Sequence, residues 1–305
     1  MTNADPEQPG PPTLRRFVSD AELDRLIAAA KAEDFGKAGD VTSAVMIDAD
    51  RGGEAVIAAR EAGVIAGGAM LWLIALAYDD GITVKLKVED GQAVEPGGVV
   101  AKLTGPLRSL LAMERVALNF CCHLSGVATL TRRFVDAVAG TEANIYDTRK
   151  TLPGLRGLEK YAVACGGGRT HRLGLHDALL IKDNHVAGLE LKAWPKAINA
   201  AIKAATQLNP KLAFSMVEVD SLDQLAVALK SSVDVVLLDN FKPESVREAV
   251  TMRDQSGKRI ELEVSGGVTL DSVRELAEAG ADRISVGALT HSAKSLDLGL
   301  DLRVD

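Results

Sequence analysis

The sequence is poor in cysteine and in aromatic residues. None of its three cysteines forms a Cys-X-X-Cys pair, so neither a disulfide framework nor a cysteine zinc site is supported, and a reducing cytoplasm is expected. Aromatic residues make up 4% of the chain, too few for stacking of bases to be the main mode of binding. A net charge of −7 also argues against non-specific nucleic-acid binding. We therefore predict a cytoplasmic protein with no nucleic-acid partner.

The sequence also lacks a convincing membrane span. Residues 62–78 carry no charge, but glycines interrupt them and charged residues flank them closely. The run falls short of the roughly 20 apolar residues that a span needs. We predict a buried strand, turn and helix here, and no membrane association.

The apolar content of the chain is sufficient for more than one core. Hydrophobic residues make up 47% of the 305 residues, which fits two domains. The proline-rich residues 1–16 are predicted to be a disordered tail. Ser19 and Glu22 then form a capping-box pattern, which predicts the start of a helix.

The first half of the chain has the pattern of a mixed α+β domain. Alternating stretches at 54–59 and 83–88 predict strands, and glycine-rich turn signals follow them. A long helical pattern covers 109–139, and we expect a break in it at Ser125 and Gly126.

From residue 143 onward, short apolar strands alternate with helical patterns. Such repeated βα units predict parallel strands joined by right-handed crossovers, in either an open sheet or a closed barrel. The predicted strands are 143–147, 178–181, 214–219, 233–238, 260–264 and 283–286. The clearest helical patterns between them are 222–229, 243–253 and 270–279.

Polar or glycine-rich residues follow each predicted strand. Four of them, Glu218, Asp239, Ser265 and Gly287, are spaced by 21 to 26 residues, which is one βα unit each. They should therefore recur at the carboxyl edge of the sheet, where such folds bind ligands. The glycines near Ser265 and Gly287 suit a phosphate cradle made of backbone N–H groups.

A basic segment stands out in this acidic protein. Residues 147–185 hold four acids against seven basic residues: Arg149, Lys150, Arg156, Lys160, Arg169, Arg172 and Lys182. This excess predicts a small polyanionic ligand. Carboxylates at Glu218 and Asp239, opposite these cations, favour Mg²⁺ bound together with substrate phosphates, although helix capping would also explain an acid after a strand.

Several polar residues have simpler structural explanations. Arg156, Lys160 and Arg169 fit solvated surface charges, and the predicted role of His123, His176 and His185 is structural. Cys165 precedes three glycines, as a reactive thiol loop would, but a packed small side chain is the more common arrangement.

Several long motifs occur along the chain in a fixed order. They are Glu114–Phe120, Leu124–Ala128, Thr148–Arg156, Lys160–Val163, Gly166–Gly168, His171–Leu175, Ile181–His185, Leu238–Phe241, Val264–Val268 and Ser285–Thr290. Together they resemble the quinolinate phosphoribosyltransferase family, also called nicotinate-nucleotide pyrophosphorylase (carboxylating), and the resemblance covers about residues 20–300.

The resemblance implies a two-domain α/β and α+β fold. Residues 17–128 would form an N-terminal α/β sandwich, and 129–290 an atypical α/β barrel of six or seven strands. Residues 291–305 would pack back on the N-terminal domain. It further implies a homodimer whose active sites are shared between subunits, with a hexamer of dimers left open.

The resemblance also assigns roles to individual residues. The implied reaction joins quinolinate to phosphoribosyl pyrophosphate (PRPP) with decarboxylation, in de novo NAD biosynthesis, and needs Mg²⁺. Arg149, His171 and Arg172 would hold the quinolinate carboxylates, helped by Arg115 from the neighbouring subunit. Lys150, Glu218 and Asp239 are the predicted catalytic residues, and the two acids are also the predicted metal ligands. The remaining predicted substrate-binding residues are Thr148, Lys182, Ser265, Gly266, Gly267, Val286, Gly287 and Ala288.

Two departures from the family pattern are visible. Met216 stands where the family often has a first acid near Glu218, so no carboxylate is expected there. Arg169 and Thr170 replace smaller or polar residues before His171.

Three other functions remain open from the residues. A Schiff-base aldolase would use Lys150 or Lys182 as a nucleophile. A sugar-phosphate-binding regulator would leave Glu218 and Asp239 without an evident use. A relative associated with molybdenum transport would share the fold and bind another substrate, but the arginines favour quinolinate.

Overall fold

The computed structural model describes residues 13–303. Within them the chain forms two compact units, described separately below. The first unit comprises 13–132, 153–167 and 292–303, and the second comprises 133–152 and 168–291.

We had expected the segment 153–167 to belong to the same unit as the rest of 129–290. It belongs to the first unit instead. Its helix α5 (Arg156–Cys165) packs on the first unit, where the Tyr161 ring lies edge-on to Phe17, with 5.9 Å between ring centroids. A Cβ added at Gly157 would lie 2.7 Å from the carbonyl oxygen of Phe17, so the two backbones approach closely.

The first unit begins with a short 3-10 helix and a 16-residue α-helix. Residues 1–12 of the predicted tail lie outside the described residues, but Leu14–Arg16 form a 3-10 helix, η1, with Leu14 buried. The tail was thus predicted too long, because burying Leu14 offsets the entropy cost of ordering this turn. The predicted capping box is confirmed at α1 (Asp20–Phe35), where Glu22 N–H donates to Ser19 Oγ. The hydroxyl and the backbone N–H of Ser19 in turn donate to the Glu22 carboxylate, and these hydrogen bonds lower the pKa of Glu22.

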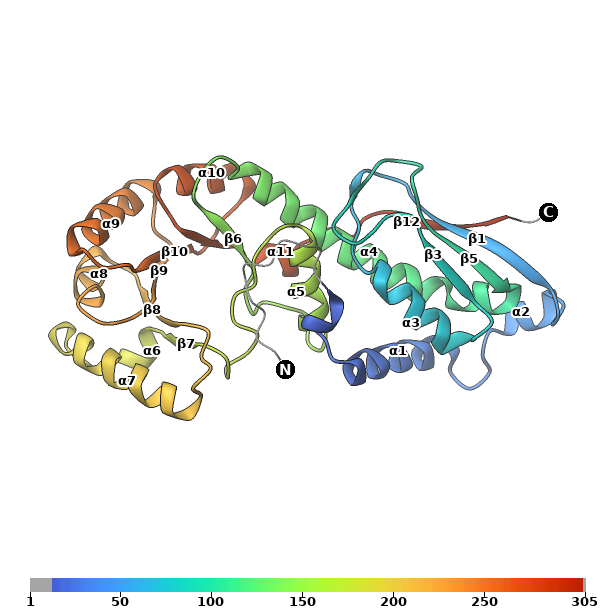
Figure 1. Cartoon of the computed structure of the whole chain (residues 1–305), viewed down its shortest axis with the longest axis horizontal. Coiled ribbons are helices and arrows are strands. Elements are labelled where there is room, and N and C mark those ends of the chain that lie inside the picture. The colour runs from blue at the N-terminus through green and yellow to red at the C-terminus, as the bar shows by residue number, and fades with distance from the viewer. Residues whose placement is uncertain (1–12, 304–305) are drawn as a thin grey trace. The chain divides into compact units, whose positions relative to one another are not determined.

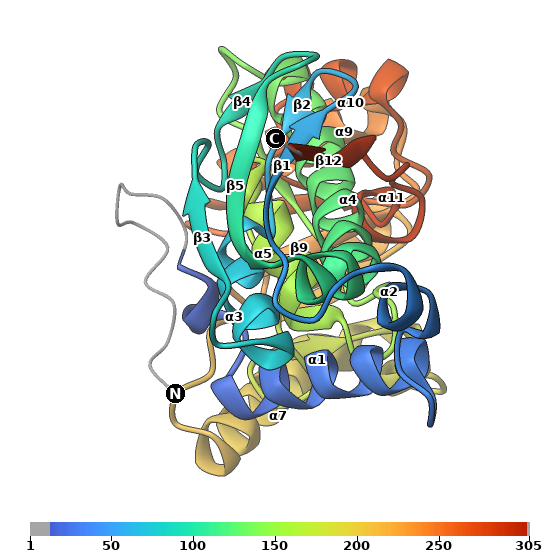
Figure 2. The ribbon, with the colours of Figure 1, turned by 90° about the vertical axis from the view of Figure 1, so that its right-hand side faces the viewer.

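An antiparallel sheet is the centre of the first unit, and Figure 2 shows β1, β5 and β12 side by side. The strand order is β12-β1-β5-β3. These strands are β1 (Gly52–Ala59), β3 (Thr83–Leu86), β5 (Val99–Pro106) and β12 (Leu298–Arg303). The strand β12 pairs with β1 from Glu54 to Ala59, so residues 298–303 belong to this sheet.

The uncharged segment 62–78 forms the predicted strand, turn and helix. Strand β2 (Gly63–Val64) pairs with β4 (Ala93–Val94), and α3 (Gly68–Tyr78) follows. Another short helix, α2 (Val41–Met46), precedes the sheet. Over residues 13–303, no helix combines the length and the apolar character needed to cross a membrane.

Helix α4 (Leu107–Ala137) is continuous, so the expected break at Ser125 and Gly126 was wrong. Ser125 Oγ instead accepts from Ala66 N–H at 3.0 Å and donates to Ala66 O at 3.1 Å. A Cβ at Gly126 would overlap the carbonyl oxygen of Lys294. The small residues are thus explained by close packing against other segments and not by local unwinding.

The second unit contains a six-stranded parallel sheet in the order β6-β11-β10-β9-β8-β7. Figure 1 shows α7, α8, α9 and α10 on the outside of this curved sheet, as in an α/β barrel. Within the described part of the chain, no ladder joins the edge strands β6 and β7. The strands are β6 (Asn144–Tyr146), β7 (Leu179–Ile181), β8 (Ser215–Val219), β9 (Val235–Asp239), β10 (Glu261–Ser265) and β11 (Arg283–Ser285). The helices are α6 (Asp183–Val186), η2 (Leu191–Ala193), α7 (Trp194–Leu208), α8 (Leu222–Ala228), α9 (Pro243–Ser256), α10 (Leu270–Glu278) and α11 (Ala288–His291).

All six predicted strands and the three clearest helices of this half are confirmed. Their register brings the polar strand ends to one edge, while apolar residues fill the layer beneath. Met216 lies in that layer, packed with Val235 and Leu237, which explains why a methionine is tolerated there.

Candidate active site

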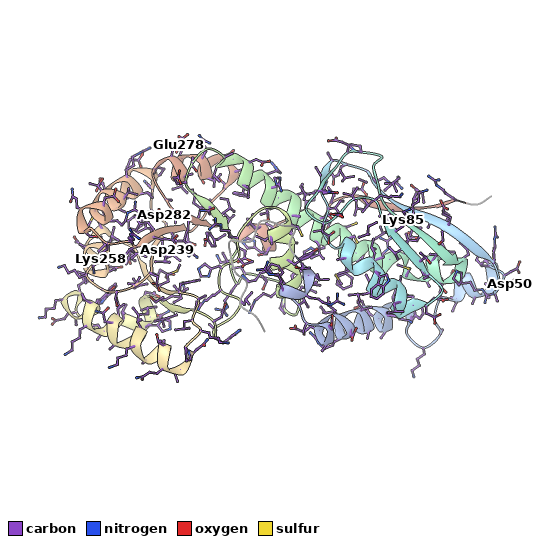
Figure 3. All side chains as sticks on the ribbon, viewed as in Figure 1. Asp50, Lys85, Asp239, Lys258, Glu278 and Asp282 are labelled. Atoms are coloured by element: carbon purple, nitrogen blue, oxygen red, sulfur yellow. The ribbon has the colours of Figure 1, made fainter. Side chains whose placement is uncertain are left out.

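The carboxyl edge of the parallel sheet gathers the predicted acidic and glycine-rich residues. Ser265 pairs with Asp239 in register, and Glu218 pairs with Leu237, two residues before Asp239. Figure 3 labels Asp239 at the end of β9. Because the strands are parallel, Glu218, Asp239 and Ser265 lie at the same edge, as their spacing predicted.

Two arginines supply positive charge that the protein does not fully neutralise. Burial, the largest effect, and the nearby charge of Arg149 lower the pKa of Arg172, and the attraction of Asp177 only partly offsets them. Arg149 Nε is also buried, and within residues 13–303 it has no hydrogen-bond partner. Neighbouring guanidinium groups of this kind suit a ligand with carboxylate groups, which would provide the missing charge and acceptors.

Lys182 and Glu218 form an ion pair between the ends of β7 and β8. Lys182 precedes α6, and its backbone N–H donates to Nδ1 of His185 at 2.9 Å. His185 is thus a capping residue of α6, in line with the predicted structural role. Glu218 is the more buried partner, with its side chain 15% exposed against 44% for Lys182.

The turn after β6 lies against the turn after β11. Thr290 Oγ1 donates to the carbonyl oxygen of Lys150 at 2.8 Å, and Lys150 N–H donates to Thr148 Oγ1 at 3.0 Å. A Cβ added at Gly287 would lie 3.0 Å from Lys150 Cδ. The Lys150 side chain therefore crosses the predicted phosphate cradle at Gly287, whose lack of a side chain leaves room for it.

Asn240 is a site residue that we did not predict. It has a left-handed backbone with φ of 57°, uncommon outside glycine, and its Nδ2 donates to Asp239 Oδ2 at 2.9 Å. Its backbone N–H donates to Ser265 O at 2.8 Å. Gly266, with φ of 99°, lies directly beside it, and a Cβ there would overlap the Asn240 side chain. The only signal in the sequence was its place beside Asp239 in the Leu238–Phe241 motif.

His171 was predicted to hold a substrate carboxylate, and its ring nitrogens face protein groups. Nδ1 accepts from Arg172 N–H at 2.7 Å, and Nε2 lies 3.3 Å from Oε1 of Glu263. The backbone N–H of His171 donates to Asp147 Oδ1 at 2.8 Å. Glu263 was not predicted, although an acid inside an apolar strand, two residues before Ser265 and on the same face, was a usable signal.

Three other residues singled out in the sequence, Arg115, His123 and Cys165, lie in the first unit. Arg115 is an exposed residue of α4 and makes no ion pair within the described chain. His123 Nε2 contacts the buried Glu159 at 2.9 Å. Burial and the charge of Asp90 raise the pKa of the Cys165 thiol, in agreement with a packed and unreactive cysteine.

The acids at the sheet edge offer few ligands for a metal ion. Within residues 13–303, no three His, Cys, Asp or Glu side chains converge as a metal site. Glu218 and Asp239 alone could offer oxygen atoms, so a metal held here would need further ligands from a substrate.

Comparisons with known proteins agree with this architecture. Residues 40–125 match the family model "Quinolinate phosphoribosyl transferase, N-terminal domain", and residues 127–301 match the model of its C-terminal domain. The chain is 44% identical over 291 residues to nicotinate-nucleotide pyrophosphorylase [carboxylating] of Mycobacterium leprae, covering 94% of this chain and all of the relative. It is 40% identical to the probable enzyme of that name from Bacillus subtilis, covering 92% of this chain and 93% of the relative.

A solved structure extends the comparison to the fold. The nicotinate-nucleotide pyrophosphorylase from Francisella tularensis matches with a TM-score of 0.84 and 36% identity, over 94% of this chain and 98% of that one. Both family models, in chain order, together cover most of the sequence. The chain therefore belongs to the quinolinate phosphoribosyltransferase family.

Proposed function

We propose that this protein transfers the phosphoribosyl group of PRPP to quinolinate, forming nicotinate mononucleotide, pyrophosphate and carbon dioxide. The observation that carries the proposal is the pair of neighbouring guanidinium groups: Arg172 is buried, and Arg149 is half-buried with its Nε buried and unpaired within residues 13–303. Quinolinate has two adjacent carboxylates, which would supply the negative charge that this pair lacks. The names of the relatives support the same reaction.

The proposed reaction needs orientation and charge more than a reactive side chain. The pyridine nitrogen of quinolinate attacks C1′ of the ribose, and the electrons of the breaking C1′–O bond leave with pyrophosphate. Positive charge that develops on the ribose would be stabilised by Glu218 and Asp239. The resulting pyridinium ring accepts the electron pair when the neighbouring carboxylate leaves as carbon dioxide, and a proton replaces it on the ring.

The other site residues would hold the two substrates in place. Lys150 and Lys182 offer point charges to phosphate, and the backbone N–H groups from Ser265 to Gly267 and from Val286 to Ala288 would hold the 5′-phosphate. His171 and Thr148 would border the quinolinate pocket. Much of the rate enhancement would come from this fixed arrangement of reactants.

Mg²⁺ fits the site as a partner of PRPP. Glu218 and Asp239 are oxygen ligands, the type that this ion prefers, and their small number suits an ion that keeps most of its coordination for pyrophosphate and water. When bound, the ion would neutralise pyrophosphate and improve it as a leaving group.

We further propose a cytoplasmic homodimer with shared active sites. The exposed Arg115, which makes no ion pair within the described chain, is the residue that would enter the pocket of the other subunit. A larger assembly, such as a hexamer of dimers, would leave this pairing unchanged.

Product analysis tests the proposed reaction. Purified protein with quinolinate, PRPP and Mg²⁺ should form nicotinate mononucleotide and carbon dioxide in equal amounts, measured by chromatography and by release of labelled carboxylate. Nicotinic acid lacks one carboxylate and would leave a buried cation unpaired, which costs roughly 3–5 kcal/mol, or two to four decades in rate. Equal turnover of both acids, or trapping of a substrate on lysine by borohydride, would contradict the proposal.

A further inference from the structure

Glu263 is a fully buried acid in the barrel interior that the proposed reaction does not use. It lies on β10, two residues before Ser265, and none of its surface is exposed. Ser285 Oγ donates to its Oε1, and Arg283 Nε lies 2.7 Å from its Oε2, although that contact lacks the direction of a hydrogen bond. A buried carboxylate is costly unless its oxygens have such partners, so its presence requires an explanation.

The carboxylate is held in its ionised form. Burial by itself would raise the pKa of Glu263, but contacts with His171, Arg283 and Ser285 outweigh that effect and keep the pKa below its ordinary value. An ionised carboxylate can only accept hydrogen bonds. The group that approaches Oε1 from His171 must therefore be an N–H.

The second ring nitrogen of His171 confirms this direction. Arg172 N–H is a donor and lies 2.7 Å from Nδ1, so Nδ1 must carry a lone pair. The proton of the neutral ring is then on Nε2, directed at Glu263, 3.3 Å away. The Phe214 ring meets the imidazole edge-on, at 5.1 Å and 87°, and limits its rotation.

Fixing the ring also fixes the peptide that carries Arg172. The His171 N–H is held by Asp147, which leads directly into Thr148 and Arg149. The Arg172 N–H is held by the His171 ring, and the ring is held by Glu263. The backbone of Arg172 is thus tied, through His171, to β10 in the barrel interior.

We propose that Glu263 is a positioning residue for quinolinate: acting through His171, it sets the imidazole tautomer and holds Arg172 beside Arg149 at the carboxylate pocket. This inference rests on the proposed function, which supplies quinolinate as the ligand. It adds a requirement for a negative charge beneath the pocket, one layer below the groups that touch substrate. The alternative is that Glu263 only balances Arg283 and stabilises the fold.

Steady-state kinetics of Glu263→Gln separate these two roles. The variant keeps the size of the side chain but replaces a charge-assisted hydrogen bond with a neutral one. We expect KM for quinolinate to rise about 10- to 100-fold, the range for a hydrogen bond to a charged group, with kcat and the KM for PRPP much less affected. The matched control is Ser285→Ala, which removes another partner of the same oxygen and should leave KM for quinolinate within about twofold.

Nitrogen NMR of labelled histidine gives a second readout that needs no variant to fold. In the wild-type protein, His171 should show a protonated Nε2 and an unprotonated Nδ1, and Glu263→Gln should introduce exchange between tautomers. A proton on Nδ1 in the wild type would overturn the inference. So would equal changes in KM for both substrates, or equal effects of Ser285→Ala and Glu263→Gln. Absence of any wild-type turnover would instead show that the proposed function itself is wrong.

Discussion

The ammonium group of Lys182 forms an ion pair with the carboxylate of Glu218, joining the ends of two neighbouring parallel strands. Both side chains are predicted to contact substrates, so in the absence of substrate the two groups that catalysis would require are paired with each other. Substrates that use these groups would have to compete with this ion pair, and each partner holds the other in place until they do.

Breaking this pair should harm activity much more than stability. Lys182→Met removes a partly exposed ion pair, which typically contributes under about 1 kcal/mol, so the thermal midpoint should change little. kcat/KM should fall by about 10- to 100-fold or more, as for loss of a charged hydrogen bond to substrate. A matched control is Lys192→Met, which breaks the exposed Lys192–Glu190 pair and should leave kcat/KM unchanged. A large fall in the thermal midpoint of Lys182→Met with full activity would assign the pair to folding.

Arg172 should be unfavourable for stability in the absence of ligand. Its pKa is lowered by burial and by Arg149, so the protonated form costs folding free energy at every pH below the folded-state pKa. Arg172→Met should therefore keep or raise the thermal midpoint while abolishing quinolinate binding, as followed by scanning calorimetry and by isothermal titration. Arg169→Met, which removes an exposed arginine of the same segment, should change neither. A lower midpoint with normal quinolinate binding would contradict the proposed role.

The glycines after β10 should differ in their tolerance of a methyl group. Gly266→Ala would force its Cβ into the Asn240 side chain, whereas Gly267 has no atom within 4 Å of an added Cβ. Both have positive φ, so each alanine costs about 1–2 kcal/mol of backbone strain. We expect a clearly larger fall in thermal midpoint, and a larger rise in KM for PRPP, for Gly266→Ala. Equal effects would mean that the contact with Asn240 does not hold the loop.

Activity should depend on a divalent cation that is bound with PRPP. EDTA should abolish turnover and added Mg²⁺ should restore it, because the acids at the sheet edge would share the ion with pyrophosphate. Asp239→Asn should weaken PRPP binding with an unchanged circular dichroism spectrum. The exposed Asp254→Asn serves as the control and should behave as the wild type. Full activity in EDTA would remove the metal from the mechanism.

The shared site can be tested by mixing two inactive variants. Arg115→Ala and Lys150→Ala homodimers should each be nearly inactive. In a mixed dimer, one site inherits both defects and the other is intact. Random exchange at equal amounts makes half of the dimers mixed, so about one quarter of wild-type activity should return, by the two-fold symmetry of the pair. Demonstrated exchange without recovery would mean that Arg115 works within its own subunit or that the interface is not the one proposed.

The sequence predicted the second unit well because its signals are local. Each strand is a short apolar run that ends in a polar or glycine residue, and parallel pairing then brings those ends to one edge. The same local reasoning failed at Ser125 and Gly126. There the small residues are required by close contact with Ala66 and Lys294, which are far away in the chain, and no local pattern reveals that contact.

The sequence by itself determined which chemical groups are present and where each strand delivers them: the arginines after β6, the acids at Glu218 and Asp239, and the glycine-rich turns. Only the tertiary structure decided how these groups meet. The proton position on His171, the neighbouring placement of Arg149 and Arg172, and the contact of Asn240 with Gly266 all depend on pairing between distant segments. The reason is physical: buried polar groups must satisfy one another in three dimensions, and the chain order does not specify the partner.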